Sequence, residues 1–162
     1  MDTFHPTQNI DLLKMLLGKR LISARRQLFK HDMELNDYEQ SADGPLELRF
    51  SSDLILHFFA ITETFSLGVA PGEMPRYGDS YIDTDVTYNK FWGKRIGNEV
   101  SRIAILTSLD GGKRHRCEFG IKIELKNRLD ILIQYLDEED SPDMIMVTDG
   151  RSSQPCMVQF IG

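Results

Sequence analysis

The sequence predicts an α+β domain, mainly antiparallel, in which a unit of one helix and four strands occurs twice with pseudo-twofold symmetry. The first observation is a repeated phrase. Residues 16–21 read Leu-Leu-Gly-Lys-Arg-Leu, and residues 91–96, which start 75 positions later, read Phe-Trp-Gly-Lys-Arg-Ile. The second is that the alternating apolar residues of 46–50 recur at the same offset in 121–125. Recurrence at a fixed offset is the signature of a repeated structural unit.

The length of the chain favours one domain, residues 1–162, because each half alone would bury too small a core. We place the first repeat at about 7–70, a linker at 71–82 and the second repeat at about 83–148. A further strand at 154–161 has no counterpart in the first repeat. The strands are expected to form two facing four-stranded sheets or one long curved sheet, because strands with one polar face must pack their apolar faces against something.

In the first repeat, Thr7 or Asn9 is expected to cap a helix that runs to about Leu17, and Gly18 ends it in a left-handed conformation. Apolar and polar residues alternate over 20–29, which indicates a strand with one wet face. Residues 31–45 contain five acidic residues and are expected to form a loop or the outer parts of two strands. A hairpin then turns at 51–53, and a strand follows over 62–69.

In the second repeat, Asp83 or Thr84 is expected to cap a short helix that ends at Gly93, in the role of Gly18. A strand over 99–109 turns at Asp-Gly-Gly, residues 110–112, and the chain returns through 113–125. Asp-Gly between apolar runs is a strong hairpin signal, because both central positions need positive φ. Two further strands are expected over 129–136 and 144–148.

Composition limits the class of protein. The net charge of −6 argues against general nucleic-acid binding and suits a basic partner. No apolar run is long enough for a membrane span, and the first six residues do not look like a signal peptide. Two cysteines, Cys117 and Cys156, do not make a disulfide framework and are expected to be reduced. We therefore expect a cytoplasmic protein that does not act at a membrane.

Motifs of catalysis and cofactor binding are missing. There is no phosphate-binding glycine loop, no dinucleotide fingerprint and no zinc spacing of His or Cys, so we expect no enzyme, no cofactor and no metal. His57 lies in an apolar strand, where a catalytic role competes with that of a strand histidine whose hydrogen bonds are satisfied. Asp83 and Asp85 could hold a divalent cation, but a helix N-terminus explains both acids more simply.

Two stretches are suited to binding another protein. The linker region combines tyrosines, which give contact area at low entropic cost, with carboxylates that attract basic groups. Its candidate residues are Tyr77, Asp79, Tyr81, Asp83 and Asp85. A run of four acids between two expected strands gives the others, which are Asp137, Glu138, Glu139 and Asp140. The simpler interpretation of each stretch is a solvated loop.

With its doubled Gly-Lys-Arg phrases, short alternating strands and acidic, tyrosine-bearing loops, the chain resembles the immunity proteins of contact-dependent growth inhibition and related bacterial polymorphic toxin systems. The resemblance implies a non-enzymatic protein that binds one cognate toxin, often a nuclease, and blocks it. Such a toxin is expected to be basic. The alternative is a small-ligand-binding or accessory domain with a pocket between the two repeat halves.

Overall fold

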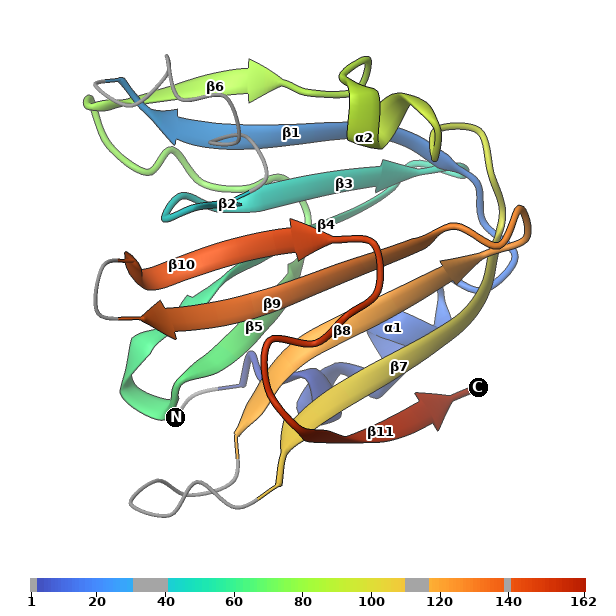
Figure 1. Cartoon of the computed structure of the whole chain (residues 1–162). Coiled ribbons are helices and arrows are strands. Elements are labelled where there is room, and N and C mark those ends of the chain that lie inside the picture. The colour runs from blue at the N-terminus through green and yellow to red at the C-terminus, as the bar shows by residue number, and fades with distance from the viewer. Residues whose placement is uncertain (1–2, 31–40, 110–116, 139–140) are drawn as a thin grey trace.

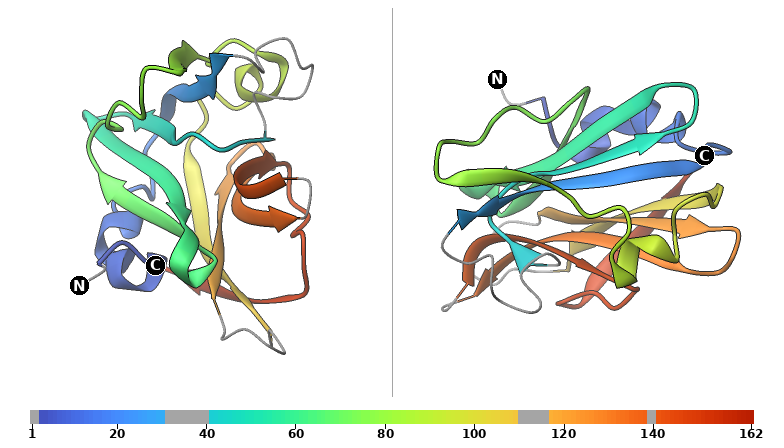
Figure 2. Two further views of the ribbon diagram at one scale, coloured as in Figure 1. Left: turned by 90° about the vertical axis from the view of Figure 1, so that its left-hand side faces the viewer. Right: turned by 90° about the horizontal axis from the view of Figure 1, so that it is seen from above.

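Two antiparallel β-sheets packed face to face form the protein in the computed structural model (Figures 1 and 2). The structure describes residues 3–30, 41–109, 117–138 and 141–162. The prediction of an α+β fold with helix-plus-four-strand units is therefore wrong. Strands dominate, and the two α-helices, α1 (Ile10–Lys14) and α2 (Lys90–Gly93), are each little more than one turn long. None of the helices in these ranges is long and apolar enough to cross a membrane.

The first sheet has the strand order β5-β4-β3-β1-β6. Its strands are β1 (Leu21–Phe29), β3 (Leu46–Phe50), β4 (Leu54–Ile61), β5 (Ser66–Pro71) and β6 (Tyr81–Asp85). The second sheet has the order β11-β7-β8-β9-β10-β2. Its strands are β7 (Val100–Ser108), β8 (Glu118–Leu125), β9 (Asp130–Glu138), β10 (Ser141–Thr148), β11 (Cys156–Ile161) and the two-residue β2 (Ser41–Ala42).

The same five-strand order therefore occurs in both sheets, with β2 added beyond β10. The central hairpins keep the offset of 75 seen in the sequence. Leu48 pairs with Leu56 in the first sheet, and Ile123 pairs with Ile131 in the second. The strand at the C-terminal end, β11, takes the place beside β7 that β6 takes beside β1. It thus has a counterpart in the first sheet, although the sequence suggested none; the duplication itself stays a prediction.

Where the two sheets join, equivalent residues of the two halves are 79 positions apart rather than 75. The N–H of Gly18 donates to the carbonyl of Val100 (3.0 Å), and the N–H of Gly97 donates to the carbonyl of Leu21 (2.7 Å). Gly18 (φ +80°) and Gly97 (φ +86°) are left-handed, whereas Gly93 is the last residue of α2. The expected equivalence of Gly18 and Gly93 is therefore wrong, because the two Gly-Lys-Arg phrases are out of register by four residues.

Both predicted helix starts also need correction. A 3₁₀-helix, η1 (Pro6–Asn9), precedes α1, and the side chain of Asn9 makes no capping hydrogen bond. Asp83 and Thr84 lie in β6 and cap nothing; the cap of α2 is Asn89, whose Oδ1 accepts from the N–H of Trp92 at 2.8 Å. Strand pairing with β1 outweighs the local capping signal of Asp83 and Thr84.

The main core lies between the sheets. The apolar faces of β1, β3 and β4 meet those of β7, β8 and β9. Fully buried side chains of the two helices, Leu13 and Trp92, and of the turn after α1, Leu16, join them. Arg26 is also fully buried on the core side of β1. Its Nη2 donates to the carbonyls of Ala42, Gly44 and Ile145, so one guanidinium links the first sheet to β2 and β10 of the second.

The last strand of each sheet is reached by a segment that crosses the outer face. We call residues 72–80 the first strap and residues 149–155 the second strap; the second crosses in front of β9 and β8 in Figure 1. Gln27 of β1 holds the first strap, since its Nε2 donates to Pro75 O (2.8 Å) and its Oε1 accepts from Tyr77 N (2.5 Å). Gln134 of β9 holds the second strap in the same way.

The bonds of Gln134 run to Arg151 O (3.3 Å) and from Ser153 N (2.8 Å). Each glutamine therefore bridges a carbonyl and the N–H two residues further along. Both are buried polar side chains on strands, and burial of an amide is tolerated only where its hydrogen bonds are made. Most of the residues predicted as a linker, 71–82, thus belong to the first strap, whereas Pro71 ends β5 and Tyr81 and Ile82 begin β6.

Candidate functional site

The tyrosine- and carboxylate-bearing candidate residues gather on the outer face of the first sheet. Asp85 pairs with Arg25 and Asp83 with Gln27, across from β1. Side chains alternate between the two faces of a strand, and Ala24 and Arg26 face the core, so Arg25 and Gln27 face outward. Their partners in β6 face outward with them. We call Tyr77, Asp79, Tyr81, Asp83 and Asp85 the β6 surface.

Three side chains of the first sheet fix the first strap. Besides Gln27, Glu47 of β3 accepts from the N–H of Met74 at 3.0 Å, and His57 of β4 donates from Nδ1 to the carbonyl of Gly72 at 2.9 Å. The strap therefore passes over β4, β3 and β1 in turn before it enters β6. His57, which sequence reasoning weighed as a catalytic candidate, has a structural role here, because its ring nitrogen holds a backbone carbonyl.

The two tyrosines of the β6 surface form one aromatic unit. The rings of Tyr77 and Tyr81 are 4.6 Å apart between centroids at an interplanar angle of 63°, an edge-to-face contact. The hydroxyl of Tyr81 donates to Asp43 Oδ2 at 2.7 Å. Tyr81 is half-buried, whereas Tyr77 is 52% exposed. One ring is thus held from beneath while the other offers an apolar surface to solvent.

The carboxylates of this surface are partly neutralised. Asp83 forms an ion pair with Arg25 at 2.9 Å, and Asp79 lies 3.8 Å from Arg76, with both side chains largely in water. Thr87, through its hydroxyl and its backbone N–H, lowers the pKa of Asp85, which therefore stays ionised at neutral pH. Exposed pairs of this kind contribute little and exchange partners readily.

A shallow pocket of about 440 Å³ opens beside these residues. Three of the five residues of the β6 surface line it, and two cations join them. The full lining is Gln27, Lys30, Met74, Arg76, Asp79, Tyr81, Ile82 and Asp83. The pocket is therefore mixed in charge, with an aromatic wall on one side, and it suits a group that can both stack and pair with a carboxylate.

Half of the second predicted stretch lies outside the described residues. Asp137 and Glu138 are the last residues of β9 in the second sheet, and Glu139 and Asp140 lie outside the described residues. The acidic residues of 31–40 and the Asp-Gly-Gly turn at 110–112 also lie outside the described residues. The strands on either side of that turn, β7 and β8, do pair. The structure therefore brings together the first set of candidates only.

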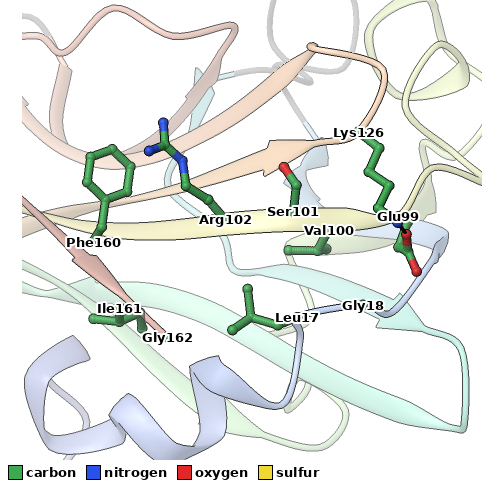
Figure 3. Close-up of a pocket in the computed structure, with 10 residues that line it drawn as sticks. All are labelled: Leu17, Gly18, Glu99, Val100, Ser101, Arg102, Lys126, Phe160, Ile161 and Gly162. Carbon is green, nitrogen blue, oxygen red and sulfur yellow. Dashed lines mark ion pairs between the residues drawn. The ribbon is translucent and has the colours of Figure 1, made fainter.

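A second pocket has a volume of about 400 Å³ (Figure 3). A pocket between the two halves was the alternative expected from the sequence, without any of its lining residues being named. It lies between Leu17 and Gly18 of the first half and strands β7 and β11 of the second. Its lining is Leu17, Gly18, Glu99, Val100, Ser101, Arg102, Lys126, Phe160, Ile161 and Gly162. No local motif marks these residues, because they meet only when the two halves join.

The charges that line this pocket are paired. Lys126 forms an ion pair with Glu99. Arg102 donates to both carboxylate oxygens of Glu124, from Nε at 2.6 Å and from Nη2 at 3.2 Å, and its guanidinium lies 4.0 Å above the ring centroid of Phe160. The pocket thus has an apolar floor with fixed, neutralised ion pairs at its rim.

In the parts of the chain that the structure describes, no group of three or more His, Cys, Asp and Glu side chains is placed to hold a metal ion. Asp83 and Asp85 are engaged by Arg25 and Thr87 instead. Cys117, just before β8, and Cys156, the first residue of β11, are free thiols that lie on either side of Ser108. No family model, no curated protein and no solved structure matches the chain.

Proposed function

We propose that the protein acts in the cytoplasm as a non-enzymatic binding protein for a basic protein, which it contacts through the β6 surface. The observation that carries the proposal is an exposed tyrosine, Tyr77, whose backbone N–H is held by the buried amide of Gln27 and whose ring packs on Tyr81 of the strand that carries Asp83 and Asp85. By the resemblance noted in the sequence, the partner is a toxin, such as a nuclease, that the bound protein blocks.

The chemistry of the β6 surface supports this proposal. A rigid aromatic ring gives a partner contact area without much loss of entropy. Arginine or lysine of a partner can replace Arg76 next to Asp79, because the ion pair between Arg76 and Asp79 is long and exposed and therefore contributes little to stability. Carboxylates around an aromatic anchor also raise the association rate of a basic partner.

The test is binding kinetics against the product of the gene adjacent to its own, at two salt concentrations. Replacing Asp79, Asp83 and Asp85 together by Lys should slow association and reduce its salt dependence, because exposed charges are screened beyond about 10 Å in 0.1 M salt. The matched control places the same charge change on exposed acids elsewhere, with Asp11, Glu63 and Asp149 replaced by Lys.

Tyr77→Ala should mainly speed dissociation, by about 10-fold or more if the ring is a hot spot. Equal association rates for the β6-surface variant and the control variant would show that this surface is not the interface. Absence of binding by the unmodified protein would refute the proposal itself.

A second candidate function is binding of a small amphipathic molecule, and the observation that favours it is the pocket between the two halves (Figure 3). Its volume of about 400 Å³ falls within the usual range of ligand sites. The fluorescent anion anilinonaphthalene sulfonate is a suitable probe. Saturable binding that Ser101→Phe abolishes by filling the pocket would support this function, and absence of binding would exclude it.

A further inference from the structure

The four outer edges of the two sheets differ in how they are protected. The backbone of Phe4 accepts from Val69 N at 2.9 Å and so covers part of the β5 edge. The two-residue β2 covers part of the β10 edge. Among the described residues, β6 and β11 are each paired with one strand only. An edge strand presents unpaired N–H and C=O groups, and natural proteins protect such edges with charge, with bulges or with covering segments.

The β6 edge carries two carboxylates, Asp83 and Asp85, which is the usual protection by charge. The β11 edge has no such protection. Its six residues, Cys-Met-Val-Gln-Phe-Ile, contain no charge, and three of its large apolar side chains are nearly half exposed: Met157 (42%), Val158 (49%) and Phe160 (47%). Val158 and Phe160 lie on one face of the strand and Met157 on the other, so both faces are open.

A charged side chain that contacts β11 is neutralised. Arg102 is bidentate to Glu124, and its guanidinium stacks on Phe160. The acids that give the chain its net charge of −6 are absent from β11 itself. A partner attracted by charge would find none on the strand, whereas a second copy of the same acidic chain meets no repulsion from it.

We propose that β11 is the interface of a homodimer, in which the β11 strands of two copies pair antiparallel about a twofold axis. Any strand edge is complementary to itself in this arrangement, and a twofold contact closes on itself. The axis passes beside Val158 or beside Gln159, because pairing about the middle of the strand uses the most backbone groups. The two six-stranded sheets then form one sheet of twelve strands.

Pairing about this axis also covers the exposed side chains. In an antiparallel pair, directly opposite residues point to the same face. An axis at Gln159 therefore places Val158 of one copy opposite Phe160 of the second, and an axis at Val158 places the two Val158 side chains opposite each other. Both arrangements bring exposed apolar side chains into contact. The dimer leaves the β6 surface free, because β6 lies at the edge of the other sheet. The inference therefore stands independently of the proposed function.

Sedimentation equilibrium tests the proposal. The unmodified protein should sediment with twice its chain mass of 18.6 kDa, and Val158→Lys should sediment at 18.6 kDa because it places like charges across the axis. The matched control is Ile82→Lys, an equally exposed apolar position on the β6 edge, which should remain dimeric. A monomeric unmodified protein, or a Val158→Lys variant that is still dimeric, would overturn the proposal.

A second measurement does not depend on how Val158→Lys folds. In a variant with Cys117 and Cys156 replaced by Ser, Val158→Cys or Gln159→Cys places a thiol next to the axis. Paired residues in an antiparallel ladder have Cα atoms about 4.5–5.5 Å apart, which suits a disulfide. Mild oxidation should yield a covalent dimer from at least one of these variants and none from Ile82→Cys. If neither variant gives a covalent dimer, the strand is not the interface.

Discussion

Replacement of Gln27 by Met should loosen the first strap with little change in volume. Gln27 is 4% exposed, and its amide makes two hydrogen bonds, at 2.8 Å to Pro75 O and at 2.5 Å from Tyr77 N. Methionine fills a similar space but can neither donate nor accept as the amide does. The strap would keep its apolar contacts and lose the bonds that fix it over β1.

The expected loss follows from these two bonds. Each contributes about 1 kcal/mol net, and a backbone group left buried without a partner costs about 1–3 kcal/mol. Because Pro75 and Tyr77 are exposed residues, water can reach part of the freed backbone, and we expect a total near the lower end, about 2–3 kcal/mol. For a chain of this size that corresponds to a fall in Tm of roughly 4–12 °C.

Urea denaturation followed by the fluorescence of Trp92, the single tryptophan, measures the loss, since this ring lies in the core. Amide hydrogen exchange of Tyr77 should accelerate in the same variant. Gln134→Met should cause a similar loss of stability and faster amide exchange at Ser153. Gln154→Met, at an exposed position, should change the free energy of unfolding by less than about 0.5 kcal/mol. A change below 0.5 kcal/mol for Gln27→Met, with Tyr77 exchange unaltered, would refute the role of the amide as anchor.

Three further predictions concern the backbone, the core and pH. Gly93→Ala should be neutral or stabilise the protein by up to about 1 kcal/mol, because a Cβ there meets nothing closer than 3.7 Å and Ala favours a helix, whereas Gly97→Ala at φ +86° should cost roughly 1–2 kcal/mol in urea unfolding. Equal effects at the two glycines would contradict the four-residue shift between the Gly-Lys-Arg phrases. Arg26→Met should cost about 3 kcal/mol, since three carbonyls lose their donor, and exchange of β10 amides should show the damage first; a stability unchanged from that of the unmodified protein would argue against the link between the sheets. Thr87 lowers the pKa of Asp85 below its usual 3.8, so Asp85 stabilises the fold above that pH, and this contribution is lost as the pH falls through the lowered value of the folded state. The difference in stability between the unmodified protein and Asp85→Asn should therefore shrink in acid, and a difference that stays constant would contradict the assignment.

The alternation of apolar residues was enough to predict the central hairpins. Residues 46–50 and 121–125 have one strictly apolar face each, and a shift of one residue would expose that face, so their register is strongly determined. The predicted helices were longer than those in the structure. Asp83 and Thr84 look like helix caps locally, but Ile82 and Thr84 pair with Leu28 and Arg26 of a strand more than 50 residues earlier. Long-range pairing of this kind leaves no local signal.

The repeated phrase gave a wrong alignment of the two halves, because the same residue types lie in different environments. In the first phrase, Arg20 is exposed; in the second, Arg95 is buried, with its guanidinium bonded to the carbonyls of Phe91 and Asp130. Burial lowers the pKa of Arg95 while Asp149 and Asp130 raise it, and the net shift is downward. One residue of the sequence is related to the straps. Gln134 is a polar residue between Ile133 and Tyr135, and the structure explains why it is buried, because its side chain bonds to the second strap.

The β6 surface was located by composition alone, since tyrosines and carboxylates at Tyr77–Asp85 are visible in the sequence. Its rigidity was not predictable, because the anchors Gln27, Glu47 and His57 come from three different strands. The same distance in sequence hid which residues line the pocket between the halves. A chain read locally shows which side chains are available, and the pairing of distant strands decides which of them meet.

Amide hydrogen exchange in the complex with the adjacent gene product is the most direct test of binding through the β6 surface. The account predicts slower exchange over the first strap and β6 on binding, above all at Tyr77 and Asp83, with no change over the second strap. Protection confined to the second sheet, or to the pocket lined by Val100 and Phe160, would contradict it.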